Sequence, residues 1–132
     1  SITNIVNKLA KVVRAAGKPI SAAVFPSPSI ARKLVRQDWA KWDLDMIFPM
    51  LYHSFYREKL PWIRKEAKEG VEALAGKFPL YAGLYLPALA KPEELKEAIL
   101  QAQKGGAKGV SLFGELSEQH WKAFEEGKIF FD

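Results

Sequence analysis

Cysteine is absent from this chain, and histidine occurs only twice, as His53 and His120. Without cysteine the protein can form no disulfide, no thiolate nucleophile and no cysteine-based zinc site. The two histidines lack the close spacing of metal ligands, so we expect no metal site and no cofactor. The absence of cysteine does not identify a cellular compartment, because many exported proteins also lack it.

Long hydrophobic runs are missing as well. No apolar stretch approaches the roughly 20 residues that cross a bilayer, so we expect no membrane span. The glycine-rich segment KGGAKG, residues 104–109, precedes an expected strand and does not open a helix, unlike a phosphate-binding loop. No Gly-x-Ser-x-Gly motif is present, which leaves a serine hydrolase unsupported.

The composition is that of one ordinary globular domain of 132 residues, 48% hydrophobic and 27% charged. The formal charge is +5, but the basic residues are mixed with glutamates, as in REKLPWIRKEAKEGVE, residues 57–72. This pattern is typical of a solvated helix face with opposite charges at close spacing. A nucleic-acid surface would gather the basic residues in one stripe, so we expect no nucleic-acid partner.

Helical and strand-like segments alternate along the whole chain. Periodic apolar positions and glycine or proline boundaries predict helices at about 3–16, 28–42, 61–75, 92–104 and 117–126. In the first of these, Ile5, Leu9 and Val12 belong to one apolar stripe. Short apolar runs predict strands at 19–25, 44–52, 79–86 and 109–114, with Pro49 near the end of the second.

Strands separated by single helices must run parallel, each crossover being right-handed. The sequence therefore predicts an α/β fold of four parallel strands alternating with helices, as in half of a TIM-type (β/α)8 barrel. A complete barrel takes about 250 residues, which makes residues 1–132 a single α/β unit with half the strands. Four parallel strands leave two unpaired edges and an uncovered face, so we expect either a missing N-terminal barrel half or a second copy to complete the sheet.

Several short motifs in this chain resemble one family of barrels. The residues that carry the resemblance are Gln37, Asp38, Trp39, Trp42, Asp45, Pro49, Met50, Tyr52, Tyr81, Gly83, Gly109, Val110 and Phe113. They resemble the C-terminal half of glycoside-hydrolase-like (β/α)8 barrels related to family 10, which are exported carbohydrate-active proteins of bacteria. The resemblance implies that the chain corresponds to strands five to eight, that it binds carbohydrate, and that it is exported to the periplasm or cell surface. It also implies that the proton donor, an acid after the fourth strand, lies outside this chain.

Barrel enzymes carry their chemistry at the C-terminal ends of the strands. That rule selects Tyr52, Tyr85 and Glu115 as residues lining a site, with Ser27 and His53 as further substrate-binding candidates. Tyr52 has two interpretations. Its ring either caps the core or stacks on a sugar while its hydroxyl bonds a sugar hydroxyl.

Glu115 is the candidate catalytic residue because it follows the fourth expected strand. It would act as base, nucleophile or hydrogen-bond acceptor for a sugar hydroxyl. A glycosidase needs two carboxylates about 5 to 9.5 Å apart, and no partner is evident at a strand end. The alternative is a structural charge at a helix N-terminus, where the dipole favours it.

Asp43 and Asp45 form a tempting pair of carboxylates, but they lie at the N-terminal end of their strand, so we interpret them as structural. The four tryptophans, which are Trp39, Trp42, Trp62 and Trp121, fall in expected helices, where we expect them to serve packing.

Two functions follow from these patterns. One is a glycoside hydrolase fragment or a carbohydrate-binding half barrel that acts at the strand C-termini; whether the chain is an enzyme by itself stays open. The other is a non-catalytic assembly or binding module that dimerises through its open barrel face.

Overall fold

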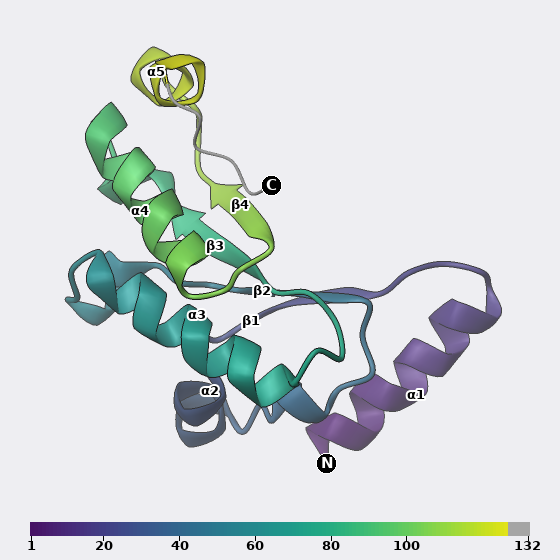
Figure 1. The fold of residues 1–132 in the computed structure, drawn as a ribbon. Helices are drawn as coiled ribbons and strands as arrows, with labels where there is room; N and C mark the ends of the chain where they lie inside the picture. The colour runs from purple at the N-terminus through teal and green to yellow at the C-terminus, as the bar shows by residue number, and fades with distance from the viewer. Residues whose placement is uncertain (127–132) are drawn as a thin grey trace.

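The computed structural model describes residues 1–126, in which helices and strands alternate as predicted (Figure 1). The helices are α1 (Ile2–Ala15), α2 (Pro28–Val35), α3 (Pro61–Leu74), α4 (Pro92–Lys104) and α5 (Glu118–Glu126). Three short 3₁₀ helices are η1 (Trp39–Lys41), η2 (His53–Tyr56) and η3 (Leu86–Ala88). The strands are β1 (Ser21–Val24), β2 (Met46–Pro49), β3 (Tyr81–Tyr85) and β4 (Gly109–Phe113).

All strand contacts among residues 1–126 are parallel. β1 pairs with β2, and β3 pairs with β4. Two parallel bridges, Ile47 to Leu80 and Met50 to Gly83, link β2 to β3, so the strands lie side by side in chain order. The predicted mixed α/β fold, with parallel strands alternating with helices, is confirmed.

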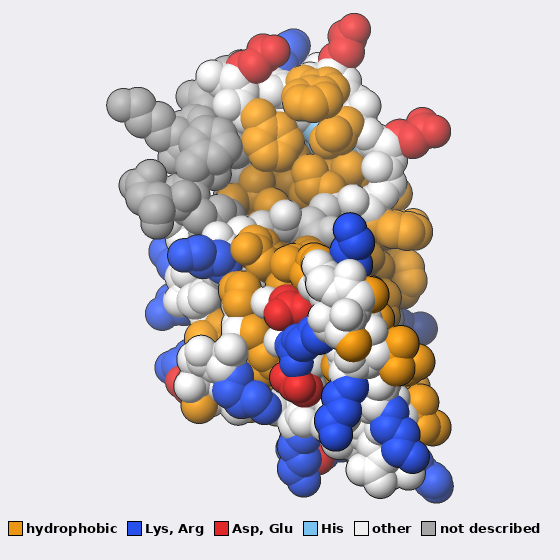
Figure 2. Space-filling view, turned by 90° about the vertical axis from the view of Figure 1, so that its right-hand side faces the viewer, with side chains coloured by type: hydrophobic (Ala, Val, Ile, Leu, Met, Phe, Trp, Pro, Cys, Tyr) orange, Lys and Arg blue, Asp and Glu red, His pale blue; other side chains and the backbone are white. Residues whose placement is uncertain are grey.

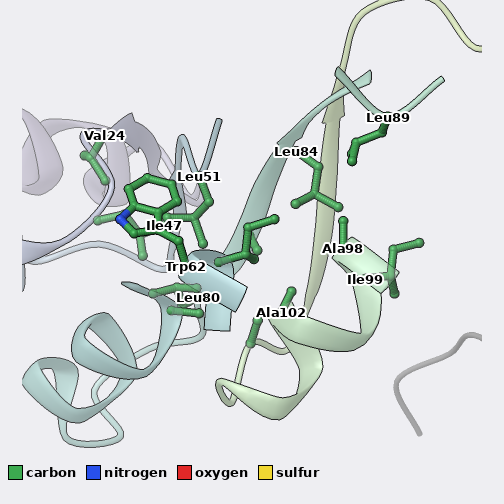
Figure 3. Packing of buried hydrophobic residues seen from close by; sticks show 14 of the residues in the cluster. Val24, Ile47, Leu51, Trp62, Leu80, Leu84, Leu89, Ala98, Ile99 and Ala102 are labelled. Atoms are coloured by element: carbon green, nitrogen blue, oxygen red, sulfur yellow. The ribbon is translucent and has the colours of Figure 1, made fainter. Parts of the chain in front are cut away.

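The core lies between one face of the strands and the helices α3 and α4 (Figure 3). Ile47, Leu80 and Leu84 point from the strands toward these helices and are fully or almost fully buried. Gly70 of α3 allows a close approach, because a Cβ there would meet Trp39 Cη2 at 2.8 Å and Leu80 Cδ1 at 2.7 Å. The missing side chain lets the indole of Trp39 lie directly against α3.

Helix α1 lies to one side of the molecule, away from α3 and α4 (Figure 1). Arg14 ties it to the start of β2 through Asp43 at 2.5 Å and Asp45 at 3.4 Å. The apolar stripe of Ile5, Leu9 and Val12 is exposed, since the described residues supply no partner for it. The pattern thus predicts the helix and its apolar face, whereas the fold leaves that face open.

The helix expected at 28–42 and the strand expected at 44–52 differ most from the structure, where both are shorter. The helix expected at 28–42 ends at Val35, because Arg36 adopts a left-handed conformation with φ 58°. The chain then forms η1 before β2. The strand expected at 44–52 pairs only over Met46–Pro49, and Pro49 is its last residue, as a proline without a donor N–H requires.

Candidate functional site

Side chains alternate between the two faces of the strands. One set faces the helices and is mostly buried. The other set faces away from the helices and stays at least partly exposed: Phe48, Met50, Tyr52, Tyr81, Tyr85 and Phe113. In a closed barrel this second face is the interior. Seen from the side on which α1 lies, the molecule exposes patches of hydrophobic side chains between its charged groups (Figure 2).

Four aromatic rings gather where β2, β3 and β4 end. We call Tyr52, Phe55, Tyr85 and Phe113 the aromatic cluster. The ring centroid of Tyr52 lies 5.6 Å from that of Phe55, 5.6 Å from Tyr85 and 5.7 Å from Phe113. Phe55 meets Tyr85 edge to face at 4.9 Å, a favoured aromatic arrangement. The parallel register explains the cluster, because it pairs Tyr85 with Phe113 at the same strand ends.

The aromatic cluster is accessible even though its members contact one another. The side chains of Phe55 and Phe113 are 63% and 58% exposed, and those of Tyr52 and Tyr85 are half-buried. Burial raises the pKa of Tyr52, so its hydroxyl remains a donor at neutral pH. Among residues 1–126, neither tyrosine hydroxyl has a hydrogen-bond partner. As far as residues 1–126 are concerned, both hydroxyls are therefore available to bond a ligand.

A cavity of about 220 Å³ opens beside the aromatic cluster. Its lining consists of Phe25, Met50, Tyr52, Phe55 and Tyr56, and we call it the aromatic cavity. Phe25 is held at the end of β1 by two bonds of its backbone. Its N–H donates to Gln37 Oε1 at 3.0 Å, and its carbonyl accepts from Trp39 Nε1 at 3.2 Å.

A second cavity, of about 460 Å³, lies where the chain passes from η2 into α3. Its lining consists of Arg57, Glu58, Lys59, Pro61, Trp62 and Lys65, and we call it the basic cavity. Tyr56 connects the two sites, since it lines the aromatic cavity and stacks on Trp62 of the basic cavity at 5.1 Å. The stacked pair therefore forms a shared wall.

A buried carboxyl group lies close to these cavities. Glu66 of α3 is 5% exposed, and its Oε2 has no hydrogen-bond partner within the described residues. Burial raises the pKa of Glu66, and a hydrogen bond from Ser27 opposes part of that shift. Burial and the charge of Glu66 together raise the pKa of Tyr56.

The sequence analysis missed Glu66, although a signal was present. Ile63, Ala67 and Gly70 occupy the buried face of α3, and helical spacing adds position 66 to that face. An acidic residue on an apolar helix face is unusual, because burial of an unpaired charge is costly. An acidic residue on this apolar face was therefore the signal that could have identified Glu66 from the sequence.

The structure places the residues that the sequence selected in different surroundings. It brings Tyr52 and Tyr85 together, with ring centroids 5.6 Å apart. Ser27 is fully buried at the N-terminus of α2, outside the lining of either cavity. Glu115 is exposed and follows Gly114, whose φ of 118° only glycine adopts readily. The ligand-binding and catalytic roles of these residues stay predictions.

His53 opens η2 but is only 9% exposed and lines neither cavity. Its Nδ1 has no hydrogen-bond partner among residues 1–126. Burial lowers the pKa of His53, and the charge of Glu94 opposes part of that shift. Its role as a substrate-binding residue is likewise a prediction.

The structural interpretation of Asp43 and Asp45 agrees with their contacts. Both bind Arg14, and Asp45 Oδ2 also accepts the backbone N–H of Ile20 at 2.7 Å. Trp39, Trp42 and Trp62 are buried as expected, whereas Trp121 is exposed. Packing accounts for three of the four tryptophans.

Parallel strands in chain order, each followed by a helix, define this chain as a partial TIM-type barrel. A solved structure of dihydrodipicolinate synthase from Bacillus clausii, a TIM-barrel enzyme, is similar to it with a TM-score of 0.52 and 20% sequence identity. The match covers 89% of this chain and 42% of the synthase, so the chain spans less than half of that enzyme. At this identity the likeness shows the fold alone.

No protein-family model matches the chain, and no curated protein matches it. The resemblance to glycoside-hydrolase-like barrels related to family 10 is therefore wrong as an assignment, since the barrel that the structure matches is a synthase. The motifs misled because several of their residues serve the structure: Asp45 accepts the N–H of Ile20, Gln37 accepts the N–H of Phe25, and Trp39 donates to the carbonyl of Phe25. The expectation of export rested on that family and falls with it.

Two further observations concern residues 1–126. They contain no group of three or more histidine, aspartate or glutamate side chains that could hold a metal ion. None of their helices is long and apolar enough to span a membrane.

Proposed function

We propose that this chain is the half of a TIM-type barrel that binds carbohydrate through the aromatic cluster at its strand C-termini. The single observation that carries the proposal is the accessible set of four rings, Tyr52, Phe55, Tyr85 and Phe113, beside the aromatic cavity. Binding sites of barrels occur at this end.

The chemistry of the aromatic cluster suits a sugar ring. Pyranose faces are apolar C–H surfaces edged with hydroxyl groups, and tyrosine offers an apolar ring face with a polar tip. Tyr52 and Tyr85 present two such tips with no partner among the described residues. The half-exposed rings would stack on the sugar while the hydroxyls fix its orientation.

Binding is better supported than hydrolysis. Hydrolysis needs two carboxylates flanking the bond, and within residues 1–126 no carboxylate lines the aromatic cavity. Glu115, exposed after β4, is the acidic residue to test for catalysis. A further barrel half would have to supply its partner.

Titration calorimetry with neutral hexasaccharides of xylose, glucose and mannose tests the proposal on the whole chain. We expect binding of at least one, with a Tyr85→Ala variant weakened at least tenfold. Tyr81→Ala is the matched control, because Tyr81 is the same residue type at the other end of β3. Failure of every neutral and acidic oligosaccharide to bind, or equal weakening by both folded variants, would contradict the proposal. Release of reducing ends that stops on Glu115→Gln would add hydrolysis.

A second candidate function is assembly, with a second copy covering the open barrel face. The observation that favours it is the exposed strand face, on which Phe48, Met50 and Tyr81 remain incompletely covered. In the described part of the chain, β1 and β4 each also have one unpaired edge. Apolar faces and free edges of this kind favour association.

Light scattering during size-exclusion chromatography tests the assembly. We expect a dimer that becomes a monomer on Phe48→Arg, which puts a charge in the centre of the open face. Trp121→Arg is the control, since it changes an exposed aromatic residue of α5 away from the strands. A monomeric parent chain would overturn this candidate and leave the sugar site untouched.

A further inference from the structure

We infer that the ligand of the aromatic cluster is an acidic carbohydrate, whose carboxylate or sulfate group enters the basic cavity. The inference rests on the proposed carbohydrate function and names the class of sugar. It depends on three features of the structure, which are the charge of the basic cavity, its connection to the aromatic cavity, and the way in which it would hold an anion.

The basic cavity carries an excess of positive charge. Arg57, Lys59 and Lys65 line it, with Glu58 as the one acidic member. Within residues 1–126, none of the three cations forms an ion pair, whereas Arg14, Arg32 and Lys41 elsewhere pair with aspartates. Three cations and one carboxylate around a hollow leave a local positive potential that attracts an anion.

The two cavities are neighbours, because the stacked rings of Tyr56, which lines the aromatic cavity, and Trp62, which lines the basic cavity, form their shared wall. Phe55 of the aromatic cluster and Arg57 of the basic cavity lie on either side of Tyr56 in the sequence. Arg57 adopts a left-handed conformation with φ 53°, which ends η2 and turns the chain toward α3. An oligosaccharide stacked on the aromatic cluster would therefore carry its next residue over this wall.

The way in which the cavity would hold an anion favours carboxylates or sulfates on a sugar chain over a phosphate. Phosphate sites at helix N-termini use free backbone N–H groups. At the start of α3, Pro61 has no N–H, and the N–H groups of Trp62 and Ile63 already donate to Lys59 and Leu60. The N–H groups of Trp62 and Ile63 are therefore not left for an anion, which the side-chain cations of the basic cavity would meet instead. The first turn of α3 has no acidic residue to repel it, and the helix dipole adds attraction.

A chemically matched pair of ligands tests the inference. Trigalacturonate and its fully methyl-esterified form share ring and linkage and differ in charge. Calorimetry on the whole chain should give at least tenfold tighter binding of the acid form at low salt, with the difference shrinking as salt rises. Lys59→Gln combined with Lys65→Gln should abolish the preference for the acid. The control pair, Lys18→Gln with Lys33→Gln, removes the same charge from exposed lysines outside both cavities and should keep it.

The outcomes separate this inference from the proposed function. Equal binding of both ligands, with loss on Tyr85→Ala, would overturn the acidic ligand and leave the carbohydrate site standing. Tighter binding of inorganic phosphate than of trigalacturonate would overturn the class of anion. Absence of binding to these ligands and to every neutral hexasaccharide would overturn both.

Discussion

Tyr56 stacks on Trp62 with ring centroids 5.1 Å apart and an interplanar angle of 28°. This contact joins η2 to the first turn of α3 and divides the aromatic cavity from the basic cavity. Trp62 is largely buried, whereas Tyr56 is only half-buried. The same pair of rings is therefore both a structural contact and the boundary between the two cavities.

Removal of the Tyr56 ring should weaken this junction. We expect Tyr56→Leu to lower the free energy of unfolding by about 1 kcal/mol, since stacked aromatic pairs contribute roughly 0.5–1.5 kcal/mol beyond their buried area. Tyr56→Phe keeps the ring and is the matched control. Urea denaturation followed by tryptophan fluorescence measures both, and equal losses for the two variants would show that the stacking is unimportant.

Glu66→Gln should stabilise the protein at neutral pH by about 1 kcal/mol, because it removes a buried carboxyl group with an unpaired oxygen. The pKa of Glu66 is raised above its usual 4.5, so wild-type stability falls as the pH rises from about 4.5 through the folded pKa. Glutamine does not titrate. The advantage of the variant should therefore be small near pH 4 and grow with pH until Glu66 is ionised.

Denaturant titrations at pH 4, 5.5 and 7.5 measure this trend. Glu69→Gln is the informative contrast, since Glu69 accepts the backbone N–H and the hydroxyl of Ser29, each at 2.8 Å. We expect that variant to destabilise the protein. An advantage of Glu66→Gln that stayed constant over this pH range would contradict the raised pKa.

Gly70→Ala should destabilise the protein in spite of the better helix propensity of alanine. The new methyl would meet Trp39 and Leu80 at less than 3 Å. Overpacking costs about 1–3 kcal/mol, and the propensity gain offsets at most roughly 1 kcal/mol of that. Leu80→Val removes one of the two clashing atoms and should recover part of the loss in the double variant. Thermal melts give the comparison, and a stabilised Gly70→Ala would mean that the site has free space.

Asp45→Ala should cost more than Asp43→Ala, although both aspartates bind Arg14. Asp45 also accepts the N–H of Ile20 at 2.7 Å, and hydrogen bonds to charged groups contribute about 1.5–3 kcal/mol. The side chain of Asp43 is 60% exposed, and exposed ion pairs contribute roughly 0–1 kcal/mol. Chemical denaturation should show a larger loss of unfolding free energy for Asp45→Ala than for Asp43→Ala. The reverse order would show that Asp43 is the more important partner of Arg14.

Much of the fold was predictable from local patterns. Pro28, Pro61 and Pro92 begin α2, α3 and α4 as expected, because a proline needs no donor at the first helical position. The apolar runs around Ile47, Leu84 and Val110 became parallel strands, since single intervening helices leave no other direction. The site was predictable only in part, through the tyrosines at two strand ends.

The elements that the sequence analysis missed depend on contacts distant in the chain. Helix α2 ends at Val35, and the Gln37 side chain accepts a hydrogen bond from the backbone N–H of Phe25. No local sequence pattern predicts this contact. Phe55 joins the aromatic cluster because η2 folds it back against Tyr85. A 3₁₀ helix as short as η2 shows no hydrophobic periodicity, so the sequence could not predict this contact. The basic cavity depends likewise on how η2 meets α3.

By itself the sequence determined the order of helices and strands, their parallel direction and the end at which Tyr52 and Tyr85 would lie, because backbone propensity and apolar periodicity act over short distances. Only the tertiary structure decided which apolar faces are covered. The stripe of Ile5, Leu9 and Val12 has the same pattern as a buried helix face, yet it is exposed, because burial depends on what packs opposite rather than on the helix that carries it.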